Sequence, residues 1–357
     1  MNLLDAYIIK RYLGSFFFIL GIVLLICVVV DFNEKIDDFI DKKPPVEEVI
    51  FDYYLNFIPF YGNLLAPICI FLAVIFFTSQ MAQRTELIPV LSSGVSFYRV
   101  LAPYIVTAFF LAGLAFLLKA YVVPVTTERQ LDFEHKYFKK RRISSNKNIH
   151  KKVAHDTFVF ISYYNEKKQE GHTFSLERIE NGDIVTKIQA DRMKWVDSTQ
   201  NWVLKKVRRR DIKDSKEVLS FYQELDTTFL LRPGDIFIRE GKQASLTLPE
   251  LLSYIEEEEL RGSDFLTELY VEKNRRYADP VAIIILTMIG FAMSSKKSRG
   301  GIALQIGLGL LICFIYITLL FAGQALTGDL YTPGMAVWTP NFIFFPIALL
   351  LLRLAPK

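Results

Sequence analysis

Six long apolar segments constrain this sequence more than any other feature. They cover residues 12–30, 55–77, 100–123, 278–294, 302–326 and 336–354. A helix needs about 20 apolar residues to cross the hydrocarbon core of a bilayer. The sequence therefore predicts six transmembrane helices. No Ala-x-Ala pattern follows the first segment, and acidic residues do, so we expect this segment to be a span rather than a cleaved signal peptide.

The charged residues are concentrated between the third and fourth apolar segments. The chain has 42 Lys and Arg and 38 Asp and Glu, and 55 of these 80 residues lie within residues 126–277, although 52% of all residues are hydrophobic. This segregation excludes an ordinary soluble enzyme, a disordered chain and a disulfide scaffold. We expect a membrane protein with a bundle of six transmembrane helices and an inserted water-exposed domain. The expected parts are residues 1–125 with the first three helices, 126–262 with the inserted domain, and 263–357 with the last three helices.

The short connections differ in charge between the two sides of the expected membrane. One side carries nine basic residues against the acids Asp5 and Glu86, whereas the other side carries three lysines against nine acids. The nine basic residues are Lys10, Arg11, Arg84, Arg99, Lys296, Lys297, Arg299, Arg353 and Lys357. Because basic residues favour the cytoplasmic side, we expect both termini in the cytoplasm and the inserted domain in the periplasm of a bacterium. The net charge of +4 is too small to indicate a nucleic-acid partner.

The inserted segment has the composition of β-strands. Residues 157–164, 174–179, 184–193 and 202–210 are rich in β-branched and aromatic residues, and Asn181-Gly182 and residues 197–200 are turn signals. Short strands joined by turns are typical of an antiparallel sandwich, and we expect a β-jelly-roll domain. Thr247, followed by Pro249 and Glu250, predicts the start of a helix over residues 249–259.

The motifs of common catalytic and cofactor sites are missing from the sequence. It contains no GxxxxGK[ST], no HExxH and no GxGxxG after a strand. His150 and His155 lie in a lysine-rich stretch at a spacing unfavourable for metal binding. We therefore expect no metal and no cofactor, and a separate protein has to supply any energy from ATP. The spans also lack paired carboxylates, which argues against a proton-driven carrier.

The cytoplasmic connection over residues 79–94 is the first candidate site. It predicts a short amphipathic helix at about 79–92, ended by Gly94. Arg84 and Glu86 are expected to face water, and the apolar residues to face lipid or a partner; those residues are Met81, Leu87, Val90 and Leu91. Such a segment is either an ordinary connector or a docking helix for a cytoplasmic protein.

Basic and aromatic residues near the expected outer face form the second candidate site. Ammonium and guanidinium groups there could pair with the phosphates of an anionic amphiphile, although long basic side chains also simply reach out to the membrane interface. The basic candidates are Lys35, Lys119, Arg129, Lys136, Arg275 and Arg276, with the run at residues 139–142. In the fifth apolar segment, Phe314 and Phe321 are either lipid-facing or part of a wall that holds acyl chains.

Motifs distributed along the whole chain resemble one known family. They are Leu4-Asp5-x-Tyr7-Ile8, Met81-Ala82-Gln83-Arg84-Thr85-Glu86-Leu87, Ser93-Gly94, Pro124, Met193-Lys194-Trp195, Trp202-x-Leu204, Leu248-Pro249-Glu250-Leu251, Arg276-x-Ala278-x-Pro280 and Trp338-x-Pro340-Asn341. In this order, and with three spans on either side of a β domain, they resemble the lipopolysaccharide export permeases LptF and LptG. The first two motifs look more like LptG.

The resemblance implies a permease subunit of an ABC exporter rather than an enzyme. Its implied partners are a second permease, a dimeric cytoplasmic ATPase similar to LptB, and a bitopic protein similar to LptC, and its substrate is lipopolysaccharide taken from the inner membrane toward the outer membrane. The family's coupling helix carries a glutamate at the position of Glu86, with Arg84 beside it, so Arg84, Thr85, Glu86, Leu87 and Gly94 are the implied coupling residues. The acidic first outer loop departs from what a phosphate-binding loop would need.

Two other functions fit parts of the sequence. A membrane-embedded enzyme acting on a lipid head group would need a catalytic cluster such as Glu128, His135 and Arg276. A structural assembly factor would use the membrane part only to tether the β domain, and six spans exceed what a tether needs.

Overall fold

The computed structural model forms two compact units. It describes residues 3–138, 147–154, 156–165, 168–180, 182–197, 199–213, 216–228, 233–236, 241–261, 265–296, 300–327 and 331–355. The helical unit comprises Met1–Lys139, Gln243–Pro249 and Thr267–Lys357, and the sheet unit comprises Lys140–Lys242 and Glu250–Leu266. The basic run at residues 139–142 lies outside the described residues.

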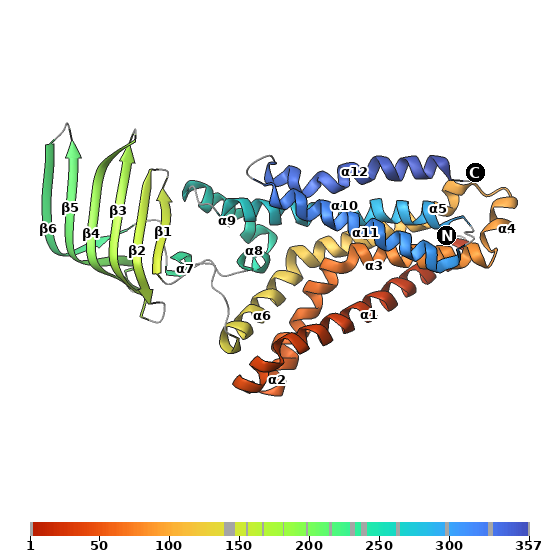
Figure 1. Ribbon diagram of the computed structural model, residues 1–357, viewed down its shortest axis with the longest axis horizontal. Coiled ribbons are helices and arrows are strands. Elements are labelled where there is room, and N and C mark those ends of the chain that lie inside the picture. The colour runs from red at the N-terminus through yellow and green to blue at the C-terminus, as the bar shows by residue number, and fades with distance from the viewer. Residues whose placement is uncertain are drawn as a thin grey trace. The chain divides into compact units, whose positions relative to one another are not determined.

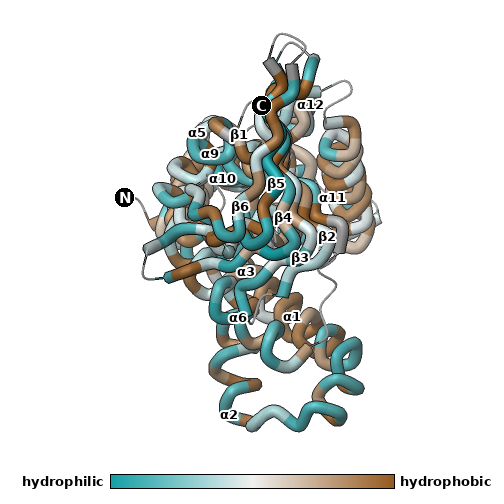
Figure 2. The backbone as a smooth tube through the Cα atoms, turned by 90° about the vertical axis from the view of Figure 1, so that its left-hand side faces the viewer, coloured by the Kyte–Doolittle hydropathy of each residue, from teal (hydrophilic) through white to brown (hydrophobic). Residues whose placement is uncertain are grey.

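The six expected transmembrane helices are confirmed. They lie in α1 (Leu3–Lys42), α3 (Leu55–Gln83), α5 (Phe97–Leu117), α10 (Leu266–Ser294), α11 (Gly301–Ala325) and α12 (Pro333–Leu354). Two of them are continuous with further helical segments: α2 (Val46–Glu48) and the π-helix η1 (Val49–Tyr54) precede α3, and the π-helix η2 (Leu118–Val122) and α6 (Val123–Tyr137) follow α5. Figure 2 shows that α11 is coloured mostly as hydrophobic, as expected for a helix in lipid.

Helices α3 and α10 form the centre of the helical unit because they contribute to both of its large apolar clusters. One cluster joins them to α1 and α5, with Ile70 and Val74 of α3 among its buried residues. The other joins them to α11 and α12, where Phe71 and Ile75 of α3 are buried. Helix α3 is thus buried on two adjacent faces, because consecutive residues lie about 100° apart around a helix, and it packs against helices of both clusters.

The two ends of the helical unit carry different elements. At one end lie both chain termini and the short helix α4 (Leu87–Ser92), and at the opposite end lie α2 and the last turns of α6 (Figure 1). These are called below the α4 end and the α2 end.

The sheet unit contains one six-stranded antiparallel sheet. Its strands are β1 (Lys147–Ala154), β2 (Thr157–Asn165), β3 (Glu170–Glu180), β4 (Asp183–Val196), β5 (Asn201–Lys213) and β6 (Lys216–Thr227). They pair in chain order from β1 to β6, so within the described residues the sheet is an up-and-down meander without crossovers (Figure 1). The antiparallel β class and the four expected strands are confirmed, while β1 and β6 at the two edges were not predicted.

One face of the sheet carries the core of this unit. Its buried residues include Ile161 on β2, Phe174 on β3 and Trp202 on β5, and Ile236 of the short helix α7 (Pro233–Ile236) packs with them. Hydrophilic and hydrophobic positions alternate along the strands (Figure 2), as expected for a sheet with one apolar face. After α8 (Lys242–Ser245), the predicted helix is confirmed as α9 (Leu248–Arg261).

Candidate functional site

A tight turn at Arg84–Glu86 separates α3 from α4 at the α4 end. The amide of Thr85 donates to the carbonyl of Ala82, and the amide of Glu86 donates to that of Met81, which is the Schellman pattern of helix termination. Thr85 has the left-handed φ of 58°, a position that usually requires glycine. The segment 79–92 is therefore two helices joined by a turn, not the single helix expected from the sequence.

The turn exposes its charged residues and buries its apolar neighbours. Arg84 and Thr85 are exposed and Glu86 is half-buried. Met81 and Leu87 are buried in the core with Phe97, so the expectation that these two residues face lipid or a partner is wrong. Burial of both apolar residues removes them from water and fixes the turn against α3 and α5.

Gly94 terminates the short helix as expected. It has a φ of 87°, and its amide donates to the carbonyl of Leu91. Ser96 then caps α5, because its side chain accepts a hydrogen bond from the amide of Arg99. The connection between α3 and α5 is thus ordered at both of its bends.

Two residues of α1 contact this connection. The guanidinium of Arg99 donates to both carboxylate oxygens of Asp5, at 2.7 and 2.8 Å. The hydroxyl of Tyr7 donates to a carboxylate oxygen of Glu86 at 3.2 Å. The sequence contained Asp5 and Tyr7 within a family motif, but no local signal assigned them partners 94 and 79 residues away.

Helices α1 and α11 are the least covered of the six spans. Only 6% of the most apolar stretch of α1 and 22% of that of α11 are buried, against 39% or more in the other four. Phe314 and Phe321 on α11 are 67% and 64% exposed, and Phe17 and Phe18 on α1 are exposed as well. These faces are open to lipid or to another apolar protein surface.

Lys35 lies within an ionic cluster at the α2 end. Its amino group is 2.7 Å from Asp31 and 3.5 Å from Glu134 of α6, and it also contacts the hydroxyl of Tyr53. The same ammonium lies over the rings of Tyr53 and Phe138, 4.7 and 5.4 Å from their centroids. Carboxylates of the chain therefore already compensate the charge of Lys35.

The other basic residues of the α6 region differ in their surroundings. Lys136 forms an ion pair of 2.8 Å with Glu48, which also accepts a hydrogen bond from Tyr137. Arg129 is exposed on the same helix. Both of these candidates for lipid phosphate are exposed, and a carboxylate of the chain already pairs with Lys136.

Lys119 and Arg276 are engaged inside the helical unit. Lys119 of η2 is 2.6 Å from Asp279 of α10. Arg276 is fully buried, and it donates to Glu272 and to the carbonyls of Gln243 and Leu246, at 3.3, 3.3 and 2.6 Å. In this conformation Arg276 does not face lipid, contrary to the sequence-based expectation, because its guanidinium is enclosed by groups of the chain.

Arg275 differs from its neighbour. It is half-buried rather than fully buried, and its Nε, like Nη1 of Arg276, has no hydrogen-bond partner among the described residues. Donors buried without a partner are uncommon in folded proteins, which leaves this guanidinium able to accept an anionic ligand.

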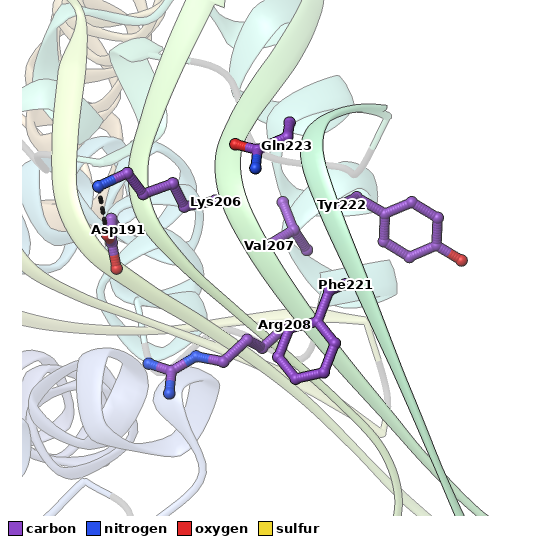
Figure 3. A pocket seen from close by; sticks show the side chains of 7 residues that line it. All are labelled: Asp191, Lys206, Val207, Arg208, Phe221, Tyr222 and Gln223. Carbon is purple, nitrogen blue, oxygen red and sulfur yellow. Dashed lines mark ion pairs between the residues drawn. The ribbon is translucent and has the colours of Figure 1, made fainter.

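A polar hollow of about 350 Å³ lies on the sheet unit, along β5 and β6. Asp191, Lys206 and Arg208 line it together with Phe221, and Lys206 points toward Asp191 at 3.7 Å (Figure 3). None of the residues predicted to bind lipid lies in this hollow. On β5, the guanidinium of Arg209 2.8 Å from Asp211 holds the pKa of that carboxyl below its usual value.

Comparison with known proteins assigns the chain to a family. Residues 6–354 match the family described as lipopolysaccharide export system permease LptF/LptG. An uncharacterized protein of Aquifex aeolicus is 22% identical over 301 residues, which cover 84% of this chain and 73% of that protein. The match does not separate LptF from LptG, so the closer likeness to LptG stays a prediction. With its six spans and its inserted antiparallel sheet, the chain belongs to the LptF/LptG family of lipopolysaccharide export permeases, which are multi-pass proteins of the inner membrane.

Proposed function

We propose that this permease is one transmembrane half of an ABC exporter driven by a separate cytoplasmic ATPase similar to LptB. The exposed turn at Arg84–Glu86 is the observation that carries the proposal. Its charged residues are available to a partner, whereas Leu87 is buried in the core with residues of α1, α3 and α5. A force applied to the turn therefore reaches several spans, since a packed core transmits displacement.

Each of the proposed coupling residues has a distinct role. Glu86 and Arg84 supply the charged contacts to the ATPase dimer. Thr85 and Gly94 adopt the left-handed conformations that bend the chain before and after α4. Leu87 anchors the helix to the core.

The proposed orientation places the α4 end in the cytoplasm and the sheet unit in the periplasm. It rests on the nine basic residues of the connections and termini on that side of the membrane. The exposed faces of α1 and α11 then border the second permease and the entering lipopolysaccharide, with Phe314 and Phe321 against acyl chains. Arg275 and Arg129 are the proposed phosphate contacts, whereas at Lys35, Lys119, Lys136 and Arg276 a phosphate would have to displace groups of the chain.

Transfer toward the outer membrane is proposed to use the edges of the sheet. Strand β6 is an edge strand with exposed Val218, Leu219 and Phe221. An edge strand offers unpaired backbone groups to a further strand, so a β domain of a periplasmic bridge, or of a bitopic protein similar to LptC, could extend the sheet.

The alternative of a lipid-modifying enzyme has less support. Its cluster would join Arg276 to Glu128 and His135 of α6. The guanidinium of Arg276 instead bonds Glu272 and two carbonyls of residues 243–246.

Co-purification tests the proposed coupling. The chain is expressed with the second permease and the ATPase, and the substitution Glu86→Arg is expected to abolish ATPase association and lipopolysaccharide export. Glu47→Arg, the same charge change on exposed α2 at the opposite end, is the control and should leave both intact. Export that persists with Glu86→Arg would refute the proposed docking.

A further inference from the structure

The first turns of α1 are tied to both bends of the connection between α3 and α5. The Asp5 carboxylate receives two charge-assisted hydrogen bonds from Arg99 at the start of α5. Tyr7 contacts Glu86 in the turn after α3. Asp5 is only 8% exposed, and a buried carboxylate held by a bidentate guanidinium is one of the stronger polar contacts in proteins.

Apolar packing continues this attachment along one face of α1. Ile8, Tyr12 and Phe16 follow one another at intervals of four residues, and all three are buried in the cluster that contains Leu87 and Phe97. The hydroxyl of Tyr12 also shares a buried hydrogen bond of 3.1 Å with Thr287 of α10. Beyond Phe16, the outer face of α1 is largely uncovered. Helix α1 is therefore firmly held at the α4 end and less covered along the rest of its apolar stretch.

We propose that Asp5 and Tyr7 are positioning residues that make the first span move with the turn at Arg84–Glu86. The inference rests on the proposed docking of an ATPase at this turn. The Tyr7 hydroxyl donates to Oε2 of Glu86, so a cationic side chain of the ATPase that binds Oε1 of the same carboxylate leaves the contact with α1 in place. The bidentate pair of Asp5 with Arg99 meanwhile keeps the start of α1 attached to α5.

The consequence concerns the lipid-facing side of the molecule. Helix α1 has the least covered apolar stretch of the six spans, and it is proposed to border the second permease. A displacement of its first turns is carried along a continuous 40-residue helix. ATPase docking at one end of the chain would thus change the position of the surface that admits lipid, without contact between the ATPase and that surface.

The test separates ATPase docking from its coupling to export. Complexes of the chain with the second permease and the ATPase are reconstituted in vesicles that contain lipopolysaccharide. The measurements are ATPase co-purification, ATP hydrolysis and lipopolysaccharide released per ATP. Asp5→Asn and Tyr7→Phe should retain the ATPase but release less lipopolysaccharide per ATP, by roughly tenfold for Asp5→Asn because a hydrogen bond to a charged group is lost.

Three further variants exclude a general effect on stability. Exchange of the charges in Asp5→Arg/Arg99→Asp should restore part of the release that either single change removes. Tyr98→Phe, at an exposed tyrosine beside Arg99, and Asp41→Asn, at the other end of α1, should behave like the wild type.

Two results would overturn the inference. The first is that Asp5→Asn and Tyr7→Phe release as much lipopolysaccharide per ATP as the wild type. The second is that the charge exchange Asp5→Arg/Arg99→Asp restores none of the release lost in the single variants. An ATPase that does not co-purify even with the wild-type chain would instead refute the docking on which the inference rests.

Discussion

The amino group of Lys119 in η2 lies 2.6 Å from a carboxylate oxygen of Asp279 in α10. These residues lie on the two helices between which the sheet unit is inserted in the chain. Both side chains are largely buried, at 12% and 19% exposure. The ion pair joins the first three spans to the last three at the point where the chain leaves one set and enters the other.

Breaking this ion pair should destabilise the helical unit. Lys119→Ala or Asp279→Asn leaves an uncompensated, largely buried partner, which costs about 3 kcal/mol. The double substitution Lys119→Met/Asp279→Leu should recover most of the loss, because no unpaired charge remains. Thermal unfolding in detergent measures the difference. Lys205→Ala, which breaks the exposed pair with Glu224, is the control and should change stability by less than about 1 kcal/mol. Equal losses of stability on breaking the Lys119–Asp279 pair and the Lys205–Glu224 pair would contradict the structure.

Arg276 is expected to hold the segment of residues 243–246 rather than a lipid. Arg276→Ala removes the donor to the carbonyls of Gln243 and Leu246, so hydrogen exchange in this segment should increase and the chain should lose about 3 kcal/mol of stability. Arg129→Ala, at an exposed arginine, should leave both properties unchanged. Unchanged exchange in residues 243–246 with Arg276→Ala would show that the guanidinium does not hold them.

Replacing two glycines of α11 by alanine should have opposite effects on stability. A Cβ atom at Gly323 would lie 2.5 Å from the carbonyl oxygen of Ala336 in α12, whereas a Cβ atom at Gly307 meets no atom within 4 Å. Gly323→Ala must separate the two helices and should cost about 2 kcal/mol. Gly307→Ala should be neutral or stabilising by up to about 1 kcal/mol, because alanine favours the helix. Thermal unfolding of the chain alone compares them, and a larger loss at Gly307 would contradict this packing.

Substitutions at the bends on either side of α4 should also change stability in opposite directions. Thr85→Gly should increase stability by about 0.5 kcal/mol, since a β-branched residue is strained at a φ of 58°. Gly94→Ala should decrease stability by about 1 kcal/mol, because alanine is disfavoured at a φ of 87°. Unfolding midpoints of the isolated chain measure both changes. A stabilising Gly94→Ala would show that the residue does not need this conformation.

The pair of Arg209 with Asp211 should stabilise the sheet unit only above acidic pH. Arg209 lowers the pKa of Asp211, so its contribution is fully present above the ordinary carboxyl pKa and is lost as the pH falls through the lowered value. Solvent screens this exposed pair, and we expect about 0.5 kcal/mol at pH 7. The fluorescence of Trp195 and Trp202 in a Trp338→Phe background reports unfolding of the sheet unit. The difference in free energy of unfolding between wild type and Arg209→Ala should be smaller at pH 2.5 than at pH 7. The same difference at both pH values would show that protonation of Asp211 does not change the stability of the sheet unit.

Elements with strong local signals were predictable. The six spans follow from apolar length, because lipid requires each span to bond its own backbone. The four central strands follow from β-branched and aromatic residues between turn signals. The edge strands β1 and β6 were missed because an edge strand has fewer buried neighbours, and β1 includes lysines and a histidine that resemble a loop.

The site was predictable in position but not in its contacts. The family motif placed Arg84 and Glu86 in a connection between spans, but not the left-handed Thr85 that breaks the expected helix. The partner of Lys119 was not predictable either, because Asp279 is 160 residues away and nothing in the sequence around either residue specifies the other.

Composition and periodicity along the chain thus settled which segments are transmembrane helices, which segments form the four central strands, and which connections carry charge, because each depends on residues close together in the sequence. Which charges are free for a partner was decided only by tertiary structure. Lys35, Arg129 and Arg276 look alike in the sequence, yet one lies in an ionic cluster, one is exposed and one is fully buried. The difference arises because the stability of a charge depends on the groups that packing brings around it.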